Sequence, residues 1–506
     1  MDAYTDYTSS ISRQKLKGTY LIKSLFLGLL IPFGFAPFHY PGLAILGIAL
    51  LFSEINNLDI KQSIRAGLLF GIGYMGFGIS WVYLSINSYG HLNIPVSLLI
   101  TTIFIIYNAL FYAAVICLYK FVSIRSSKLL SCFLFSACYC LGEFARANLG
   151  TGFPWLLLGF GQIDTPLRYL LPFIGVYGVG FVSVLASSLL VYSNKKSKYK
   201  IAYLISFVII LLFPLSLKNY KTSNVSKDLI SVAAIQANLA MRDNWDEDLF
   251  LQMLNRYHLS IKQLAKQTDL IILPESSIPV PANYASSFIS EINKLAKNHN
   301  TTLLIGIPKS ANKNESKYLN TLLALGINHG FYSKQHLVPF GEYIPKPFAK
   351  LADLLNIPDA SMTQGNSNQA LLKVKNHHIA SLICYEIAYP ELLRKQLPKA
   401  KWIVSISDDG WFGHSLAIYQ QQQMSQVLSI LSGRYQVVAN NDGLSSIIDN
   451  KGNILNSARA FSSEDLCGNI HSATGRTIWV VFGDKPFLFL SILITIIAFF
   501  KQRRYS

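Results

Sequence analysis

The chain has 506 residues, of which 51% are hydrophobic and only 14% are charged. This composition is too apolar for an ordinary soluble two-domain protein and too charged through its middle for a membrane bundle alone. The formal net charge of +17 suggests nucleic acid as a partner. The basic residues, however, lie at the ends of apolar segments, so we expect no nucleic acid.

Apolar segments of nearly membrane-spanning length fill the first part of the chain and recur at its end. A transmembrane helix needs about 20 apolar residues. We therefore expect a membrane domain over residues 1–218 with about seven transmembrane helices, and a last transmembrane helix with a basic cytoplasmic tail over residues 485–506. The expected spans are residues 19–35, 41–54, 66–86, 95–120, 128–143, 167–192, 200–217 and 486–500.

Lysine and arginine gather on alternate sides of these segments. The odd-numbered loops are nearly bare, whereas basic residues fill the two tails and the even-numbered loops, for example Arg13, Lys61, Arg125, Lys196 and Arg503. Positively charged short loops stay in the cytoplasm. The alternation predicts cytoplasmic termini and places the region between the seventh and eighth spans on the outer face of the membrane.

Two features of the apolar region allow more than one explanation. Glu143 and Arg146 precede the motif Thr151–Trp155. Ionisable residues near membrane depth are functional candidates, which favours head-group contact, but a local pair at i, i+3 spacing that fixes the loop explains them equally. The run Gly71–Gly76 matches a dinucleotide fingerprint, but it lies inside an apolar segment, so we interpret it as close helix packing.

Residues 219–484 have a different pattern, in which short β-rich apolar runs alternate with amphipathic helical stretches such as Asp246–Gln267 and Phe288–Lys297. This alternation predicts an extracytoplasmic α/β domain of about 250 residues, large enough for its own core. The apolar runs cover residues 229–235, 270–273, 302–306, 321–325, 379–383, 402–406 and 435–439.

Glu275, Lys334 and Cys384 each stand at the end of an apolar run of that domain. A free cysteine has a pKa near ~8.5, and its nucleophilic form is the thiolate, so it needs a base and a cationic neighbour. Glu275 can take the proton, and Lys334 can stabilise the thiolate and an oxyanion. Singly, the three could be a strand cap, a surface charge and a core residue. Together they suggest covalent acyl chemistry.

The chain has six cysteines, and their spacing suggests no zinc site. Four of them lie in apolar segments, where a cysteine is usually a small buried hydrophobic residue. Cys467 could pair with Cys384 in an oxidising compartment. We expect Cys384 to be free, because thiolate chemistry needs an unbridged sulfur.

At these residues the sequence resembles the nitrilase, or carbon–nitrogen hydrolase, superfamily with its Glu–Lys–Cys triad. Over nearly the whole chain it resembles more closely the apolipoprotein N-acyltransferase family of bacterial envelopes. Membrane motifs and catalytic motifs together are more specific than the triad alone. The motifs are Phe35–Phe38, Gly78–Tyr83, Thr151–Trp155, Asn244–Asp246, Leu273–Ser276, His336–Glu342, Cys384–Glu386 and Trp411–Gly413.

The resemblance implies a multi-span α-helical membrane bundle that carries an α/β nitrilase-like, four-layer αββα sandwich. It also implies a ping-pong reaction without cofactor or metal. Cys384 takes a fatty acyl chain from a phospholipid, typically phosphatidylethanolamine, as a thioester. The α-amino group of the S-diacylglyceryl-cysteine at the N-terminus of an apolipoprotein then accepts the chain, which completes lipoprotein maturation.

The resemblance assigns further roles in the same site. Glu275 is the general base, and Lys334 forms the oxyanion hole with the backbone N–H of Tyr385. Glu342 and Glu386 are supporting acids near the nucleophile. The remaining assignment is Trp245, which with Tyr385 lines the substrate side.

The chain departs from the family pattern at several positions that bear on substrate contacts. Asp408–Asp409 stands where the family often has Asn–Asp, and Val438 stands where it often has arginine. Arg434 matches a family position to which the sequence assigns no role.

We therefore expect a monomeric enzyme in the bacterial inner membrane, in contact with the lipid bilayer, with its catalytic domain on the periplasmic side. The nearest alternative is a membrane-anchored nitrilase-type amidase that hydrolyses an amide or nitrile. A transporter or receptor with a degenerate sensory domain is an alternative from another class. The intact triad and the lack of a broken-helix pair in the sequence argue against it.

Overall fold

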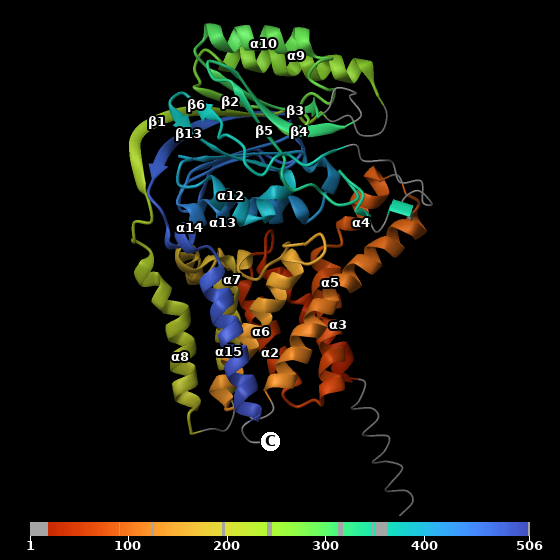
Figure 1. Ribbon diagram of the computed structural model, residues 1–506, viewed down its shortest axis with the longest axis vertical. Helices are drawn as coiled ribbons and strands as arrows, with labels where there is room; N and C mark the ends of the chain where they lie inside the picture. The colour runs from red at the N-terminus through yellow and green to blue at the C-terminus, as the bar shows by residue number, and fades with distance from the viewer. Residues whose placement is uncertain are drawn as a thin grey trace, which may run out of the picture. The chain divides into compact units, whose positions relative to one another are not determined.

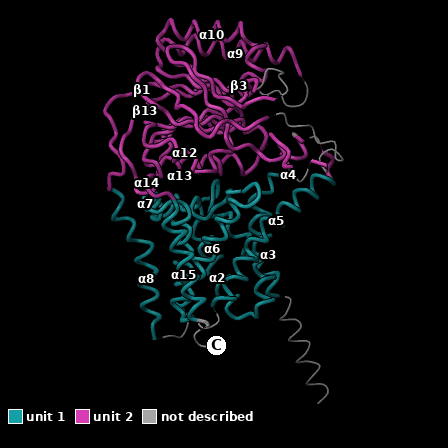
Figure 2. Tube along the Cα trace, in the orientation of Figure 1, with its two compact units in different colours: residues 1–83, 95–219, 484–506 teal, residues 84–94, 220–483 magenta. Residues whose placement is uncertain are grey.

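The computed structural model describes residues 19–90, 92–123, 126–194, 198–239, 245–311, 317–346, 349–350 and 362–503 (Figure 1). The chain divides into two compact units, which Figure 2 colours separately. Unit 1 comprises residues 1–83, 95–219 and 484–506, and unit 2 comprises residues 84–94 and 220–483. Arg13, Arg125, Lys196 and Asn244, which entered the sequence predictions, lie outside the described residues.

Unit 1 is helical, with apolar helices at the predicted positions. Among the described residues, four helical segments are long and apolar enough to cross a membrane, namely Ile94–Val122, Lys128–Asn148, Pro166–Ser193 and Lys200–Leu217. Thr19–Gly34 and Pro41–Ile55 are shorter apolar helices. A domain with several apolar helices is thus confirmed, and the count of eight spans stays a prediction. The longer helices are α2 (Pro41–Ile55), α3 (Ile60–Gly78), α5 (Ile94–Val122), α6 (Lys128–Asn148), α7 (Leu171–Ser193), α8 (Lys200–Leu212) and α15 (Lys485–Arg503).

The expected continuous span over residues 66–86 is wrong. Helix α3 ends at Gly78, and the helical turns Val82–Ser88 that follow are bent from it by 61°. Residues 84–94 belong to unit 2, where the Ser85 hydroxyl donates to the backbone oxygen of Trp411 at 2.8 Å. A hydropathy pattern cannot show this long-range contact. The chain therefore does contain a broken helix, contrary to the expectation from its sequence.

Glycines allow helix α3 to approach its neighbours closely. A Cβ atom on Gly71 would lie 2.7 Å from Ala109 Cα in α5, and one on Gly73 would lie 2.1 Å from the Leu25 carbonyl oxygen. Backbone atoms at these distances leave no room for a side chain. The interpretation of Gly71–Gly76 as a packing surface is confirmed at these two glycines.

Glu143 and Arg146 face the interior of unit 1, and only 2% and 1% of their surfaces are exposed. Arg146 donates to the carbonyl oxygens of Phe153 and Trp155 at 2.7 and 2.8 Å. Glu143 accepts from the backbone N–H of Leu158 at 2.8 Å. The two side chains fix the loop that contains the Thr151–Trp155 motif. Contact with a lipid head group is wrong for them, because their burial leaves no accessible charge.

Unit 2 contains two facing mixed β-sheets. The first has the order β13-β1-β2-β3-β4-β5, and the second has the order β12-β11-β10-β9-β8. The first sheet consists of β1 (Asn224–Gln236), β2 (Leu270–Ile272), β3 (Thr302–Ser310), β4 (Tyr318–Gly326), β5 (Gly330–Ser333) and β13 (Glu464–Thr474). The second consists of β8 (Ala380–Ile383), β9 (Ile403–Ser407), β10 (Gln436–Asn440), β11 (Ser446–Ile448) and β12 (Ile454–Ser457). A separate hairpin pairs β6 (Lys373–Val374) with β7 (His377–His378).

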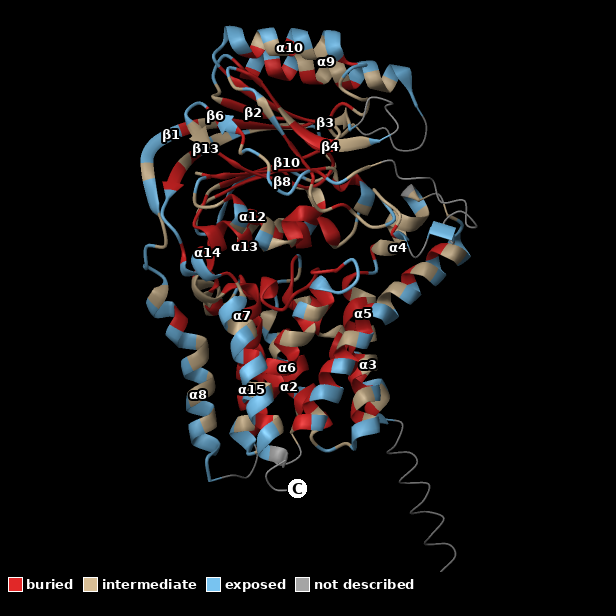
Figure 3. Ribbon diagram, in the orientation of Figure 1, coloured by how far each residue is buried: buried red, intermediate tan, exposed pale blue. Residues whose placement is uncertain are grey.

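Helices cover the outer face of each sheet and complete four layers. Helices α9 (Glu247–Leu264) and α10 (Ser286–Asn298) lie over the first sheet, and α12 (Pro390–Gln396) and α13 (Ala417–Ser432) lie over the second (Figure 1). Apolar side chains of the two sheets pack together between them, and this interior is buried in Figure 3. A second apolar cluster joins the first sheet to α9 and α10. The predicted αββα sandwich is confirmed, and each of the seven predicted apolar runs overlaps a strand.

Gly306 in β3 allows the segment that ends at Glu275 to lie against the strand. A Cβ atom there would lie 2.2 Å from the Pro274 carbonyl oxygen and 2.7 Å from Glu275 Cα. We expect Gly306→Ala to cost about 1–3 kcal/mol of stability through overpacking. It should also lower activity about tenfold, because Glu275 is displaced. Gly42→Ala is the control, since its Cβ meets open space. Unchanged thermal stability and activity in Gly306→Ala would contradict this account.

Candidate active site

Residues at the ends of strands from both sheets form the candidate site. Glu275 follows β2, Lys334 follows β5, and Cys384 follows β8. Carboxyl ends of neighbouring parallel strands meet at one edge of a sheet, where loops can carry reactive groups. The structure brings the three predicted residues together: Lys334 Nζ lies 3.3 Å from Glu275 Oε1, and both charges act on the Cys384 thiol.

Lys334 forms a buried ion triad with two carboxylates. Besides Glu275, its Nζ lies 2.8 Å from Oε1 of Glu342, and the Lys334 side chain is 1% exposed. Burial alone lowers the pKa of a lysine. The negative charges of Glu275 and Glu342 outweigh that effect and hold the pKa of Lys334 well above its usual value. Lys334 therefore stays charged, which the role predicted for it in stabilising an oxyanion requires.

Cys384 is partly buried and has a left-handed backbone with φ of +51°. A non-glycine residue in this region stores strain of about 1–3 kcal/mol, which typically marks a functional site. Burial raises the pKa of the Cys384 thiol well above its usual value, and the charge of Glu275 raises it further, while Lys334 opposes both. The resting side chain is thus a thiol, which needs a base before it can attack.

Glu386 joins the segment after Lys334 to the strand that leads to Cys384. Its carboxylate accepts from the backbone N–H groups of Gln335 at 2.6 Å and Ile383 at 2.8 Å, and from the Tyr332 hydroxyl at 3.0 Å. Burial raises the pKa of Glu386 to about 7. These contacts of Glu386 are to Tyr332, Gln335 and Ile383, so its geometry fits the predicted supporting role rather than a direct one.

The predicted substrate-side residues lie in different environments. Tyr385 is buried, and its hydroxyl accepts from that of Tyr389 at 3.2 Å. Its N–H stands in the first turn of the 3-10 helix η7 (Cys384–Ala388). Trp245 is 57% exposed before α9 and packs on Phe250, with ring centroids 4.9 Å apart. Contact of Trp245 with substrate stays a prediction.

Asn320 is a part of this site that was not predicted, and Asp408 and Asp409, noted only as a departure from the family pattern, also belong to it. The Asn320 amide donates to Glu275 Oε1 at 2.6 Å, and the backbone N–H of Asp408 donates to Glu275 Oε2 at 3.1 Å. Asp409 is buried, which raises its pKa to about 7, and it accepts from Ser407 Oγ at 2.6 Å. Asparagine is a poor strand former. Its place immediately before an apolar run was the one available signal.

Arg434 has a structural role, whereas the structure assigns no role to Cys467. The buried Arg434 guanidinium donates to the carbonyl oxygens of Ala400 at 3.1 Å and Gly475 at 2.8 Å, so it ties loops together away from Cys384. Cys384 and Cys467 are both free thiols, and Cys467 is exposed.

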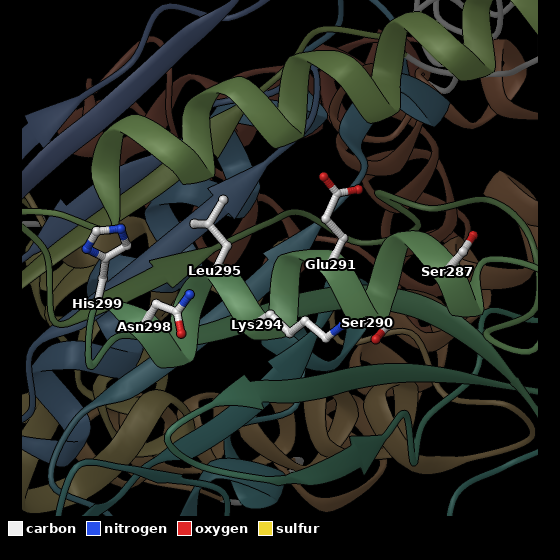
Figure 4. A pocket seen from close by; sticks show the side chains of 7 residues that line it. All are labelled: Ser287, Ser290, Glu291, Lys294, Leu295, Asn298 and His299. Atoms are coloured by element: carbon white, nitrogen blue, oxygen red, sulfur yellow. The ribbon is translucent and has the colours of Figure 1, made fainter.

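A separate surface hollow lies along α10 and contains none of the triad (Figure 4). Glu291 at this hollow lies 3.4 Å from His258 Nδ1 of α9. The hollow is lined by Ser287, Ser290, Glu291, Lys294, Leu295, Asn298 and His299. Its open, mixed lining lacks the strained nucleophile and buried charges of the candidate site.

Comparison with known families agrees with this geometry. Residues 231–477 match the family model described as carbon–nitrogen hydrolase, which defines the class of the sandwich. Residues 27–189 match the model described as apolipoprotein N-acyltransferase N-terminal domain. A crystal structure of a carbon–nitrogen hydrolase from Helicobacter pylori G27 covers 55% of this chain and 96% of its own, with 16% identity and a TM-score of 0.37.

Full-length relatives give the particular family. The apolipoprotein N-acyltransferase of Coxiella burnetii is 33% identical over 94% of this chain and 99% of its own length. That of Pseudomonas aeruginosa PAO1 is 33% identical over 92% of both. The chain belongs to the apolipoprotein N-acyltransferase family. The predicted family and the enzyme class, an acyltransferase, are thereby confirmed.

His336 provides a test of the electrostatics beside Lys334. Burial and the charge of Lys334 lower its pKa to about 4, and its ring stacks on Tyr389 with centroids 3.7 Å apart. The unfolded chain, with a histidine pKa near ~6.5, binds more protons than the native state between these values, so stability falls as pH drops through them. We expect His336→Phe, which keeps the stack, to lose less thermal stability than wild type between pH 7 and pH 4.5. Equal losses would contradict this assignment.

Proposed function

We propose that the chain transfers a fatty acyl chain from a phospholipid to the α-amino group of the N-terminal S-diacylglyceryl-cysteine of apolipoproteins. The observation that carries the proposal is the buried group of Glu275, Lys334 and Glu342 beside the strained Cys384, in a chain of this family. Both substrates are lipids, which agrees with the apolar helices of unit 1. Confinement of enzyme and substrates to one membrane raises their effective concentration.

In the first half-reaction, Glu275 takes the proton of the Cys384 thiol. The sulfur attacks the carbonyl carbon of the sn-1 ester, and the oxyanion accepts from Lys334 and the N–H of Tyr385. The C–O bond then breaks. The proton on Glu275 passes to the leaving oxygen, so lysophospholipid departs and an acyl thioester remains on Cys384.

In the second half-reaction, the α-amino group attacks the thioester carbonyl while Glu275 takes a proton from the amine. The same donors stabilise the second oxyanion. The C–S bond breaks, the amide forms, and the proton on Glu275 passes to the sulfur, which restores the thiol of Cys384. Water must be kept from the thioester until the amine arrives. The buried Tyr385 and the partly buried Tyr389, whose ring centroids lie 5.3 Å apart, support such exclusion.

We place the enzyme in the bacterial inner membrane as a monomer, with unit 2 on the periplasmic side and phosphatidylethanolamine as the usual donor. The distribution of basic residues supports this orientation, since Lys61 and Arg503 lie in a loop and a tail predicted to be cytoplasmic.

A transfer assay tests the function. Purified wild type with phosphatidylethanolamine vesicles and a diacylglyceryl-cysteine peptide should yield triacylated peptide, measured by mass spectrometry. Cys384→Ala should lower the rate about 10³-fold or more, because the nucleophile is lost. Cys467→Ala removes an exposed free thiol and should leave the rate unchanged. Release of free fatty acid with no triacylated peptide would instead indicate a hydrolase.

Labelling of Cys467 tests the orientation. Because this thiol is exposed in unit 2, a membrane-impermeant maleimide should label it in intact spheroplasts. Cys467→Ala should remove that label and is the matched control. Labelling only after the membrane is permeabilised would place unit 2 in the cytoplasm and overturn the orientation.

A further inference from the structure

Asn320, near the start of β4, contacts three members of the catalytic group. Its side-chain amide donates to Glu275 Oε1 at 2.6 Å and to Glu342 Oε1 at 3.1 Å. Its backbone oxygen accepts from the N–H of Lys334 at 2.8 Å. Both side-chain partners are carboxylate oxygens, so the orientation of the amide is fixed by chemistry. Asn320 is 5% exposed, so these contacts are shielded from water.

The contacts to Glu275 occupy most of its carboxylate. A carboxylate offers about four lone-pair sites, two on each oxygen. Oε1 accepts from Asn320 and Lys334, and Oε2 accepts from the Asp408 N–H. Among the donors in the described part of the chain, these three leave one site open, and it is on Oε2. That site can take the proton of the thiol and then of the amine.

Asn320 and Lys334 bridge the same two oxygens. The Lys334 ammonium also donates to Glu275 Oε1 and Glu342 Oε1, at 3.3 and 2.8 Å. An ammonium has three donors. With two of them on these carboxylates, the third is available to an oxyanion. The neutral Asn320 amide adds two further hydrogen bonds to the carboxylate pair without adding charge.

We infer that Asn320 is a positioning residue for the general base: it holds Oε1 of Glu275 against Glu342, so that Oε2 faces the proton to be removed. The inference rests on the proposed function for the reaction that this base serves. Without the amide, Lys334 alone separates two carboxylates, and Glu275 keeps only two of its three donors, Lys334 and the Asp408 N–H, so its carboxylate is less firmly oriented. Asn320 itself touches no reacting atom.

The charges around this base determine how a test at several pH values is read. Groups that act on Glu275 or its partners come from every neighbouring segment. They are Lys334 after β5, His336 and Glu342 in the following loop, Cys384 and Glu386 in η7, and Asp408 and Asp409 after β9. All are retained in the variants proposed below, so a difference between variants reports on position 320.

Two substitutions separate positioning from packing. Asn320→Leu keeps approximate size but removes both donors, and Asn320→Asp keeps the shape but places a third carboxylate beside Glu275 and Glu342. Thr321→Val is the matched control, because Thr321 is a buried neighbour whose hydroxyl contacts Ser333 and Leu319 instead. We expect Asn320→Leu to slow thioester formation about 30-fold at pH 7, with little change in the KM for phospholipid.

The pH dependence of the Asn320→Asp rate distinguishes positioning from a purely structural role, because a structural role would leave the pH profile unchanged. At pH 7 Asn320→Asp should be slower than Asn320→Leu, because its charge repels the two carboxylates. At pH 5 part of the loss should be recovered, since a protonated carboxyl can donate one hydrogen bond. Thr321→Val should keep the wild-type rate and pH profile.

Alkylation of Cys384 by iodoacetamide, followed by mass spectrometry of its peptide, separates this inference from the proposed function. It needs no phospholipid, so it reports on the base even if wild type forms no thioester. We expect alkylation at pH 7 to fall about tenfold or more in Asn320→Leu and to be unchanged in Thr321→Val. Folded Asn320→Leu and Asn320→Asp proteins with wild-type alkylation rates would overturn the positioning role.

Discussion

The candidate site depends on one buried cation held between two carboxylates. Lys334 is 1% exposed and donates to both Glu275 and Glu342. Removing one partner from such a group leaves an uncompensated buried charge, at a cost of about 3–5 kcal/mol. The first sheet therefore has to bring the ends of β2 and β5 to one place. Three residues support this geometry. Gly306 lets the backbone at Glu275 approach β3 closely, the Asn320 amide donates to the Glu275 carboxylate, and the Glu386 carboxylate accepts from the backbone N–H of Gln335.

The same arrangement explains why a thiol with a raised pKa can still react. A permanently ionised Cys384 thiolate would be repelled by the carboxylate of Glu275, so the thiol loses its proton only when Glu275 can accept it. The left-handed backbone at Cys384 places its side chain at the end of β8 at a cost in local strain. Rigid strands fix the positions of the side chains that follow them.

Much of this could be predicted from sequence. The seven apolar runs of unit 2 and the three triad residues were recognisable, because a buried strand and a reactive residue at its end are both local patterns. Residues whose role depends on contacts with residues distant in the sequence could not be predicted. The role of Asn320 follows only from its contact with Glu275. The break after Gly78 becomes explicable only from the contact of Ser85 with Trp411. Burial also decided between two open interpretations, since Glu143 and Arg146 bind a loop inside unit 1.

The central claim is that Cys384 carries the acyl chain. Intact-protein mass spectrometry after incubation with phosphatidylethanolamine, with wild type beside Cys384→Ser, tests it most directly. The account predicts one added acyl group in wild type, removed by hydroxylamine as a thioester is, and none of this labile adduct in the variant. A hydroxylamine-labile adduct of equal yield in both proteins, or none in a folded wild type that still produces triacylated peptide, would contradict it.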